Sequence, residues 1–207
     1  VNRAFNRMTS QLQQSQRDRA LLLAGVSHDL RTPLTRLRLS AEFLNDEEMS
    51  QGIIADIEDM DAILDQFISF IRDGADEQPD YENLNDLIDE VAAKYPREQL
   101  RIRQKDLPRL MLKRLTVKRM LSNLITNALK YGAAPVEIDT ALDDNALVLV
   151  VRDHGKGVRE EDIPLLLQPF SRGEKARTLS GSGLGLAIVK RIVDMHHGEM
   201  ALDNHPH

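Results

Sequence analysis

The N-terminal third of the chain has the pattern of two long amphipathic helices. Helical periodicity over residues 1–44 is interrupted only by Pro33, and a second periodic segment follows a polar corner at 45–48. In both segments the packing positions recur at alternating steps of three and four, which is typical of helices that pack against other helices. The first stripe consists of Leu23, Val26, Leu30, Pro33, Leu37, Ser40 and Leu44. The second stripe consists of Ile53, Ile57, Met60, Leu64, Phe67 and Ile71. Two helices joined by a short turn predict an antiparallel hairpin, and because each has more apolar face than one partner can cover, we expect a four-helix bundle of two copies.

His28 lies on the side of the first helix that faces away from this stripe. The stripe passes through the residues two before and two after it, which puts His28 at the position farthest from the packing face. Arg31 and Thr32, three and four residues later, are its neighbours on the outward face. Pro33 lacks a backbone donor and clashes with the carbonyl four residues earlier, so we expect a kink beside His28. A functional histidine and a merely solvated polar face both remain open from this stretch alone.

The segment before His28 changes its packing phase. Its apolar positions stop at Leu12 and resume at Leu23, a four-residue stutter relative to a seven-residue repeat, and residues 13–19 between them are wholly polar. One hypothesis is a soft joint where an incoming helix changes phase. The alternative is an indifferent, solvated segment of helix.

A second domain of mixed α/β pattern follows a short linker. Glycine, proline and acids without periodicity place the linker at 74–80, between a helical domain over 20–73 and an α/β domain over 81–207. Helices are expected over 83–95, 115–131, 162–168 and 184–197, with Gly132 and Gly198 ending the second and the fourth. Strands are expected over 100–104, 109–112, 136–142, 146–152 and 199–202.

Composition excludes several classes of protein and of site. The 207 residues carry a net charge of -6, so nucleic acid is not an expected partner, because phosphate contacts need a basic excess. The absence of cysteine excludes disulfides and thiolate metal sites. The longest apolar run near the N-terminus, Leu21–Val26, is far shorter than the roughly 20 residues of a membrane-spanning helix. Because the sequence starts at Val1 without methionine, we expect it to be a piece of a longer protein.

Two asparagines on one expected helix indicate a cation site. Asn123 and Asn127 lie four residues apart and therefore face one direction. Carboxamide oxygens can help hold a hard cation such as Mg²⁺, which also keeps water and phosphate oxygens in its shell. This spacing is weak evidence by itself, because a solvated helix face has it as well.

Two glycine-bearing segments further along the chain indicate a nucleotide. Asp153 follows a strand end and precedes Gly155 and Gly157, so its carboxylate can accept a hydrogen bond from an exocyclic amine such as that of adenine, although a tight turn would look the same. The segment 181–186 opens the last helix, and its amides and the helix dipole offer a phosphate site. It is neither a Walker loop nor a dinucleotide fingerprint, because the lysine of the first and the parallel strand pattern of the second are missing.

In order and spacing these motifs resemble those of the sensor histidine kinases of bacterial two-component systems. The motifs are Ser27-His28-Asp29-Leu30-Arg31-Thr32-Pro33, Asn123-Leu-Ile-Thr-Asn127-Ala, Asp153-x-Gly155-x-Gly157, Pro169-Phe170 and Gly181-Ser182-Gly183-Leu184-Gly185-Leu186. The resemblance covers residues from about 20 to 203, and over 24–36, 168–173 and 185–189 it is strongest to osmosensing members. It implies an all-α hairpin that dimerises into a four-helix bundle, followed by the α/β sandwich ATP-binding domain shared with gyrase-type ATPases.

The resemblance also implies roles for individual residues. His28 would accept the phosphoryl group, Asp29 would be its base or orienter, and Thr32 would position a water that dephosphorylates the partner. Asn127, with Asn123, would hold Mg²⁺ on the phosphates of ATP. The remaining nucleotide contacts that it implies are Asp153 on the adenine amine together with Lys130, Tyr131, Gly155, Gly157, Phe170, Gly181, Gly183, Leu184 and Gly185.

The protein so implied is a homodimeric kinase that uses ATP to phosphorylate His28 and passes the phosphoryl group to an aspartate of a response regulator, of the porin-regulator type, in osmosensing. The chain would be the cytoplasmic portion of a bacterial inner-membrane protein, with residues 1–19 as the end of an upstream signalling helix and membrane contact only through segments before it. A non-catalytic dimeric scaffold with a regulatory nucleotide site and a gyrase-type ATPase are the alternative interpretations. Two departures from the family are His154, where an acidic or amide residue is common, and the end of the chain before the final strand that such domains add.

Overall fold

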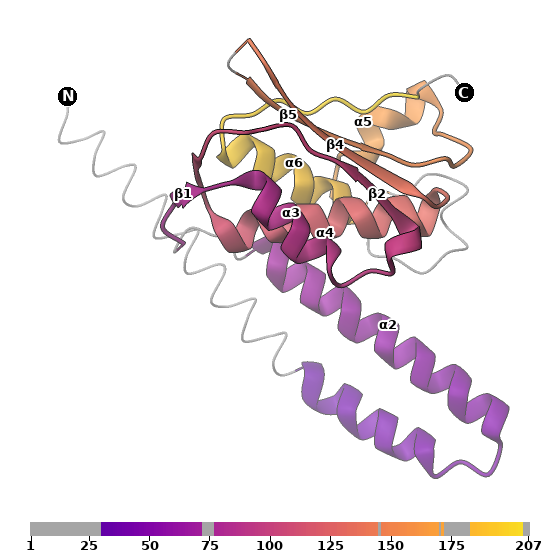
Figure 1. The fold of residues 1–207 in the computed structure, drawn as a ribbon. Coiled ribbons are helices and arrows are strands. Elements are labelled where there is room, and N and C mark those ends of the chain that lie inside the picture. Colours follow the sequence, from indigo (N-terminus) through magenta and orange to yellow (C-terminus); the bar gives the residue numbers. More distant parts are fainter. Residues whose placement is uncertain (1–29, 72–76, 145, 170, 172–182, 205–207) are drawn as a thin grey trace. The chain divides into compact units, whose positions relative to one another are not determined.

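The computed structural model divides the chain into two compact units, residues 1–73 and residues 74–207 (Figure 1). Within them the structure describes residues 30–71, 77–144, 146–169, 171 and 183–204. Over these residues no helix combines the length and the apolar content needed to cross a membrane.

The first unit is the predicted helical hairpin. Its first arm is helical over residues 30–42, and its second arm is α2, Glu47–Ile71. Asp46 caps α2, because its carboxylate accepts a hydrogen bond from the Met49 amide at 3.0 Å. The Ser50 hydroxyl donates to the Ala41 carbonyl at 2.8 Å and ties the start of α2 to the end of the first arm. Polar side chains of the corner therefore fix the turn.

The apolar residues buried in this hairpin are mostly not those of the predicted stripes. Leu34, Ala41 and Ile57 are only 9%, 3% and 4% exposed, and an ion pair between Arg38 and Glu58, with N and O atoms 3.3 Å apart, bridges the arms. Five of the predicted stripe residues instead stay between 37% and 54% exposed, namely Leu30, Leu37, Leu44, Ile53 and Met60. The first arm thus turns the neighbouring row of side chains to α2, where the small Ala41 allows close approach, and leaves the predicted stripe uncovered within one chain.

The second unit is an α/β sandwich with its long helices on one side of the sheet (Figure 1). Strand β2 (Leu100–Arg103) runs parallel to β4 (Val136–Asp143), which pairs antiparallel with β5 (Ala146–Arg152). A separate antiparallel pair is formed by β1 (Asp80–Glu82) and β3 (Leu110–Leu112). The helices are α3 (Leu84–Ala92), α4 (Arg114–Tyr131) and α6 (Gly185–Met195), with the short turns η1 (Arg97–Gln99), η2 (Glu160–Asp162) and α5 (Ile163–Leu166).

The alternation of residues along β4 explains the two faces of this sheet. Val136 and Ile138 are fully buried and belong to the core cluster that also contains side chains of α3 and α4. Glu137 and Asp139 alternate with them and therefore point to the opposite face. The core covers one face of the sheet, and the carboxylates on the other face need partners of opposite charge.

Arginines of the neighbouring strands provide that pairing. Arg103 of β2 lies 2.5 Å from a Glu137 oxygen and 2.6 Å from an Asp139 oxygen, and Arg152 of β5 lies 3.5 Å from Glu137. The hydrogen bonds from Arg103 lower the pKa of both carboxyl groups. Glu137 is only 7% exposed, and a carboxylate that is so nearly buried is stable when it is paired in this way.

Two helices end differently from the prediction. Helix α4 does stop at Gly132, but the φ of Gly132 is -100°, which is not left-handed, and a Cβ there would lie 2.2 Å from Asp153 Cγ. Close approach, rather than conformational freedom, requires this glycine. Helix α6 closes with a Schellman motif in which His197, at φ 57°, takes the left-handed position and the Gly198 amide donates to the Val193 carbonyl at 2.9 Å. Gly198 is therefore not the left-handed terminator of α6.

Two predicted elements of the C-terminal part are also corrected. The helix expected over 162–168 is reduced to α5, a single turn that follows η2. The strand expected over 199–202 is absent from the described residues 198–204. The Asn204 carboxamide accepts from the Val158 amide at 2.9 Å and donates to the Val158 carbonyl at 2.6 Å. A side chain thus takes the two hydrogen bonds that a neighbouring strand would make.

Candidate active site

Only part of the predicted site lies in the described part of the chain. Thr32 is exposed on the first arm of the hairpin. His28, Asp29, Phe170 and Gly181 lie outside the described residues, as do the expected kink and the polar joint that precedes it. The geometry available is therefore that of the second unit.

Helix α4 brings the carboxamide of Asn127 against the start of α6. Asn123 and Asn127 are half-buried, and Asn123 Nδ2 donates to the Arg119 carbonyl at 2.9 Å, a bond that occupies the amide nitrogen and not the oxygen. Gly185, the first residue of α6, lies against Asn127. A Cβ added to Gly185 would lie 2.9 Å from Asn127 Nδ2 and 3.0 Å from Asn127 Oδ1. Two motifs far apart in sequence are thus in direct contact.

The turn into α6 directs its positive end to the same place. Gly183 has a φ of 68°, a left-handed value that favours glycine, and Leu184 after it is fully buried and anchors the turn. The structure describes no side-chain cap and no acidic residue in the first turn of α6. Amides at such a helix start, together with the helix dipole, bind phosphate groups.

The loop after β5 lies against the C-terminal end of α4. Asp153 Oδ1 accepts a hydrogen bond from the Gly155 amide at 2.7 Å, and a Cβ added to Gly155 would lie 2.7 Å from Gly132 Cα. The Asp153 carboxylate is therefore packed over the last turn of α4. Tyr131 in that turn is 44% exposed, and the Lys130 ammonium lies 5.7 Å from the centre of its ring.

These two contacts lie close together along α4. Asn127 and Gly132 are five residues apart, about 7.5 Å along a helix axis. A carboxylate suited to an amine, carboxamides suited to a cation and a helix start suited to phosphate therefore meet over the C-terminal half of one helix.

The donor set fits Mg²⁺. Its members are the carboxamides of Asn123 and Asn127, and oxygen donors suit a hard cation. Within the described ranges no group of three or more His, Cys, Asp or Glu side chains could hold a metal ion. A cation at this place would therefore depend on phosphate oxygens for the rest of its ligands.

Two contacts that brace the loop after β5 were not predicted from the sequence. Gly157, at φ 67°, lies so close to Asn204 that an added Cβ would be 2.4 Å from Asn204 Oδ1, so the C-terminal segment braces the glycine loop. His154 Nε2 lies 3.7 Å from Glu137 Oε1, which links the same loop to the ion pairs of the sheet. The alternating arginines of 101–103 and acids of 137–139 were the available signal for those pairs, whereas nothing in the sequence indicated Asn204.

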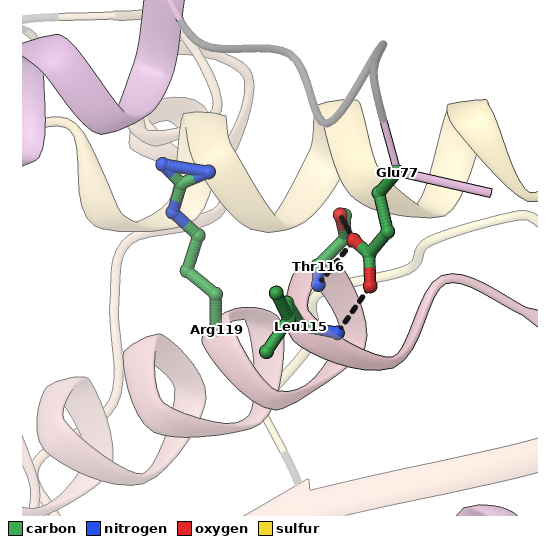
Figure 2. Close-up of a pocket in the computed structure, with 4 residues that line it drawn as sticks. All are labelled: Glu77, Leu115, Thr116 and Arg119. Atoms are coloured by element: carbon green, nitrogen blue, oxygen red, sulfur yellow. Dashed lines mark hydrogen bonds between the residues drawn. The ribbon is translucent and has the colours of Figure 1, made fainter. Parts of the chain in front are cut away.

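A hollow of about 330 Å³ lies at the other end of α4. Its lining residues are Glu77, Leu115, Thr116 and Arg119, and Figure 2 shows the Glu77 carboxylate turned to the first turn of the helix. Among the described residues, none of those predicted to contact the nucleotide lines this hollow, so it is distinct from the site above.

Known proteins resemble both parts of the chain. Residues 18–75 match the family described as His Kinase A (phospho-acceptor) domain. Residues 113–207 match the family described as Histidine kinase-, DNA gyrase B-, and HSP90-like ATPase. Both descriptions agree with the helical hairpin and the α/β sandwich.

Individual relatives match across both units. Sensor histidine kinase GtrS of Pseudomonas aeruginosa is 33% identical over 208 residues, 99% of this chain and 43% of that protein. The signal transduction histidine-protein kinase/phosphatase MprB of Mycolicibacterium paratuberculosis is 29% identical over 231 residues, again 99% of this chain and 43% of that protein. The NMR structure of the histidine kinase domain of the E. coli osmosensor EnvZ shares 34% identity over 62% of this chain and 81% of that chain, with a TM-score of 0.49. The chain spans less than half the length of the first two proteins.

Proposed function

Because this chain belongs to the sensor histidine kinase family, we propose that it transfers the γ-phosphoryl group of ATP to His28 and from there to an aspartate of a response regulator. The observation that carries the ATP part is the meeting of Asn127 with Gly185 and of Asp153 with Gly132 on one half of α4. The assignment of His28 rests on the motif around it and on the match of residues 18–75 to the phospho-acceptor family.

Different residues of the second unit bind different parts of the nucleotide. Asp153 accepts a hydrogen bond from the adenine amine, and the start of α6 after Gly183 receives the phosphates. Asn127 and Asn123 hold Mg²⁺, which supplies charge neutralisation on the phosphates when bound. Lys130 adds positive charge and Tyr131 lines the pocket, while the loop glycines allow close approach of the backbone. Phe170 and Gly181 complete this proposed set of contacts.

The phosphoryl step on His28 needs a neutral imidazole. One ring nitrogen attacks the γ-phosphorus, the bond to the bridging oxygen breaks, and ADP leaves as the phosphorus–nitrogen bond forms. Asp29 holds or accepts the proton of the other ring nitrogen and so keeps the attacking nitrogen unprotonated. Binding both reactants in one protein supplies the positioning that this transfer requires.

We further propose that two copies act together through the hairpin. Its uncovered stripe residues Leu30, Leu37 and Met60 are 45%, 54% and 52% exposed, and a row of large apolar side chains is the surface that a four-helix bundle of two copies would cover. Thr32, exposed on the outward face, would position the water for phosphatase activity toward the phosphorylated partner. The name of the relative MprB, a kinase/phosphatase, supports both activities in one protein.

The finer identity is also a proposal. We assign the chain to an osmosensing kinase with a response regulator of the porin-regulator type, as the cytoplasmic portion of an inner-membrane protein. Support comes from the resemblance to osmosensing members over 24–36, 168–173 and 185–189, and from the 34% identity to the osmosensor EnvZ domain. A phosphotransfer profile across the response regulators of one genome tests it, and transfer preferring a regulator of another type would overturn it.

Labelled ATP tests the central proposal. The protein incubated with γ-labelled ATP and Mg²⁺ should acquire acid-labile, alkali-stable label, which His28→Ala and Asn127→Ala abolish. Thr32→Ala should keep autophosphorylation and lose phosphatase activity toward the phosphorylated regulator. Label that survives in His28→Ala would defeat the site assignment, and an unchanged phosphatase rate in Thr32→Ala would defeat the role of Thr32.

A further inference from the structure

We propose that Glu77 is a releasable clasp that fastens the segment leaving the hairpin to the start of α4, and so sets how far the second unit can reach from α2. This inference rests on the proposed function for its biological meaning. The Glu77 clasp denotes the Glu77 carboxylate with the Leu115 amide, the Thr116 amide and the Thr116 hydroxyl.

Helix α4 does not cap its own N-terminus. Lys113 at the cap position makes no side-chain capping bond, and the first turn holds no acidic residue. Glu77, far earlier in the chain, supplies what is missing. Its oxygens accept from the Leu115 amide at 2.6 Å, from the Thr116 amide at 3.0 Å and from the Thr116 hydroxyl at 2.5 Å. A carboxylate at the positive end of a helix is favourably placed.

The electrostatics of the clasp agree with its geometry. Partial burial alone would raise the pKa of Glu77, but the hydrogen bonds from Thr116 and Leu115 outweigh it, and the pKa is lowered. Thr116 is only 4% exposed, so the hydroxyl that Glu77 accepts from is buried. The carboxylate also borders the hollow of about 330 Å³, across which Arg119 lies, as Figure 2 shows. The hollow thus leaves open space on one side of the carboxylate.

The start of α4 has other anchors, so losing the clasp does not unfold it. Arg114 binds Glu82 of β1 at 3.0 Å and also pairs with Glu90 of α3. His196 at the end of α6 accepts the Lys113 amide on Nε2 at 3.1 Å. Three elements therefore hold this end of the helix when Glu77 is absent from it.

The clasp shortens the segment that connects α2 to the second unit. From Ile71, the last residue of α2, six residue steps lead to Glu77, a maximum reach of about 20 Å. When the clasp is released, the first fixed residue becomes Asp80 at the start of β1, nine steps away, with a reach of about 30 Å. A tether lengthened in this proportion lowers the local concentration of its end by about twofold. Helix α4, which carries Asn123 and Asn127, is the element to which the shorter tether is tied.

The experiment separates tethering from helix capping in the full 207-residue chain. Glu77→Gln removes the clasp. Glu77→Gln combined with Lys113→Ser adds a local cap to α4, because serine at an N-cap is worth about 1 kcal/mol, without restoring the tether. Asp106→Asn, at an exposed carboxylate, is the charge-matched control. Since the chain has no cysteine, Asp59→Cys and Glu98→Cys, both at exposed positions, give two clean spin-label sites in each background, one in each unit.

Three measurements decide the outcome. In Glu77→Gln we expect faster hydrogen exchange at the Leu115 and Thr116 amides. We also expect a broader and longer distance distribution between the labels, measured in samples diluted with unlabelled chain. The autophosphorylation rate at saturating ATP should be lower by about twofold, with KM for ATP unchanged. The added Lys113→Ser should restore amide protection and leave both the distance distribution and the rate altered. Recovery of distance and rate together with the cap would make Glu77 a structural cap only and overturn the proposal, as would wild-type distances in Glu77→Gln. If the unaltered chain takes no label from ATP, the proposed function fails, and the distance measurement alone decides the clasp.

Discussion

Gly185→Ala tests the contact on which the nucleotide site is built. The new Cβ would lie 2.9 Å and 3.0 Å from the two terminal atoms of Asn127, against an optimal separation of about 3.5–4.0 Å. The carboxamide has to turn away, and an off-rotamer side chain costs about 0.5–1.5 kcal/mol. Alanine is at the same time a better helix former than glycine, by about 1 kcal/mol. These two effects nearly cancel in the stability of the unit.

The effect on ATP does not cancel. In the proposed site, a carboxamide turned from its position loses its geometry toward the cation and the phosphates, and a loss of about 1.4 kcal/mol is a tenfold loss of affinity. We therefore expect Gly185→Ala to bind ATP with Mg²⁺ about tenfold more weakly while its free energy of unfolding changes by less than about 1 kcal/mol. Titration with a fluorescent ATP analogue and urea unfolding measure the two quantities.

Gly52→Ala is the matched control. Gly52 lies in α2 with no atom within 4 Å of an added Cβ, so the exchange should stabilise the helix by about 0.5–1 kcal/mol and leave ATP affinity unchanged. Wild-type affinity in Gly185→Ala would refute the argument that Asn127 must stand where it does.

Two further predictions concern stability. His197→Gly should raise the free energy of unfolding by about 1 kcal/mol, because a left-handed residue with a Cβ costs about that much at φ 57°, and a urea titration in which it equals or falls below the parent would contradict the reason given for the end of α6. Arg103 lowers the pKa of Glu137 and Asp139, so below about pH 5 the unfolded chain binds more protons than the folded chain. The stabilisation from these pairs is therefore present above that pH and is lost as the pH falls. Arg103→Gln should make this acid loss shallower in urea unfolding between about pH 5 and pH 3, and equal slopes in the two proteins would count against the pairing.

Local signals predicted the helices α3, α4 and α6 and the strand pair β4–β5, whereas strand β1 was not predicted and begins inside the expected linker 74–80. Asn83, one of two asparagines whose residue type suits a helix cap at this place, caps α3 by accepting from the Asn85 amide at 2.9 Å, and β4 and β5 form the expected hairpin. These features depend on residues that are near one another in sequence. The motif glycines were also informative, since Gly185 and Gly155 are both required by close approach to another segment.

Features made by distant residues escaped prediction. The heptad pattern did not distinguish the row of Leu34 and Ala41, which the hairpin buries, from the neighbouring row of Leu30 and Leu37, because both rows are apolar. Gly132 ends α4 as predicted, but the close approach of Asp153, from another segment, is the reason why a glycine is needed there. Such choices are decided by what packs across the space between elements, and sequence periodicity does not record that.

The way in which α4 begins has a consequence for the order of folding. Its first turn carries Arg114 rather than an acid, and its cap residue makes no capping bond. The contacts at this N-terminal end come instead from Glu77, from Glu90 of α3 and from His196 of α6. An isolated helix with an unfavourable first turn is marginal in water. The helix that bears both asparagines should thus form late, as the distant segments assemble around it, and a fragment that ends before α6 would lose this helix along with the proposed phosphate-binding turn.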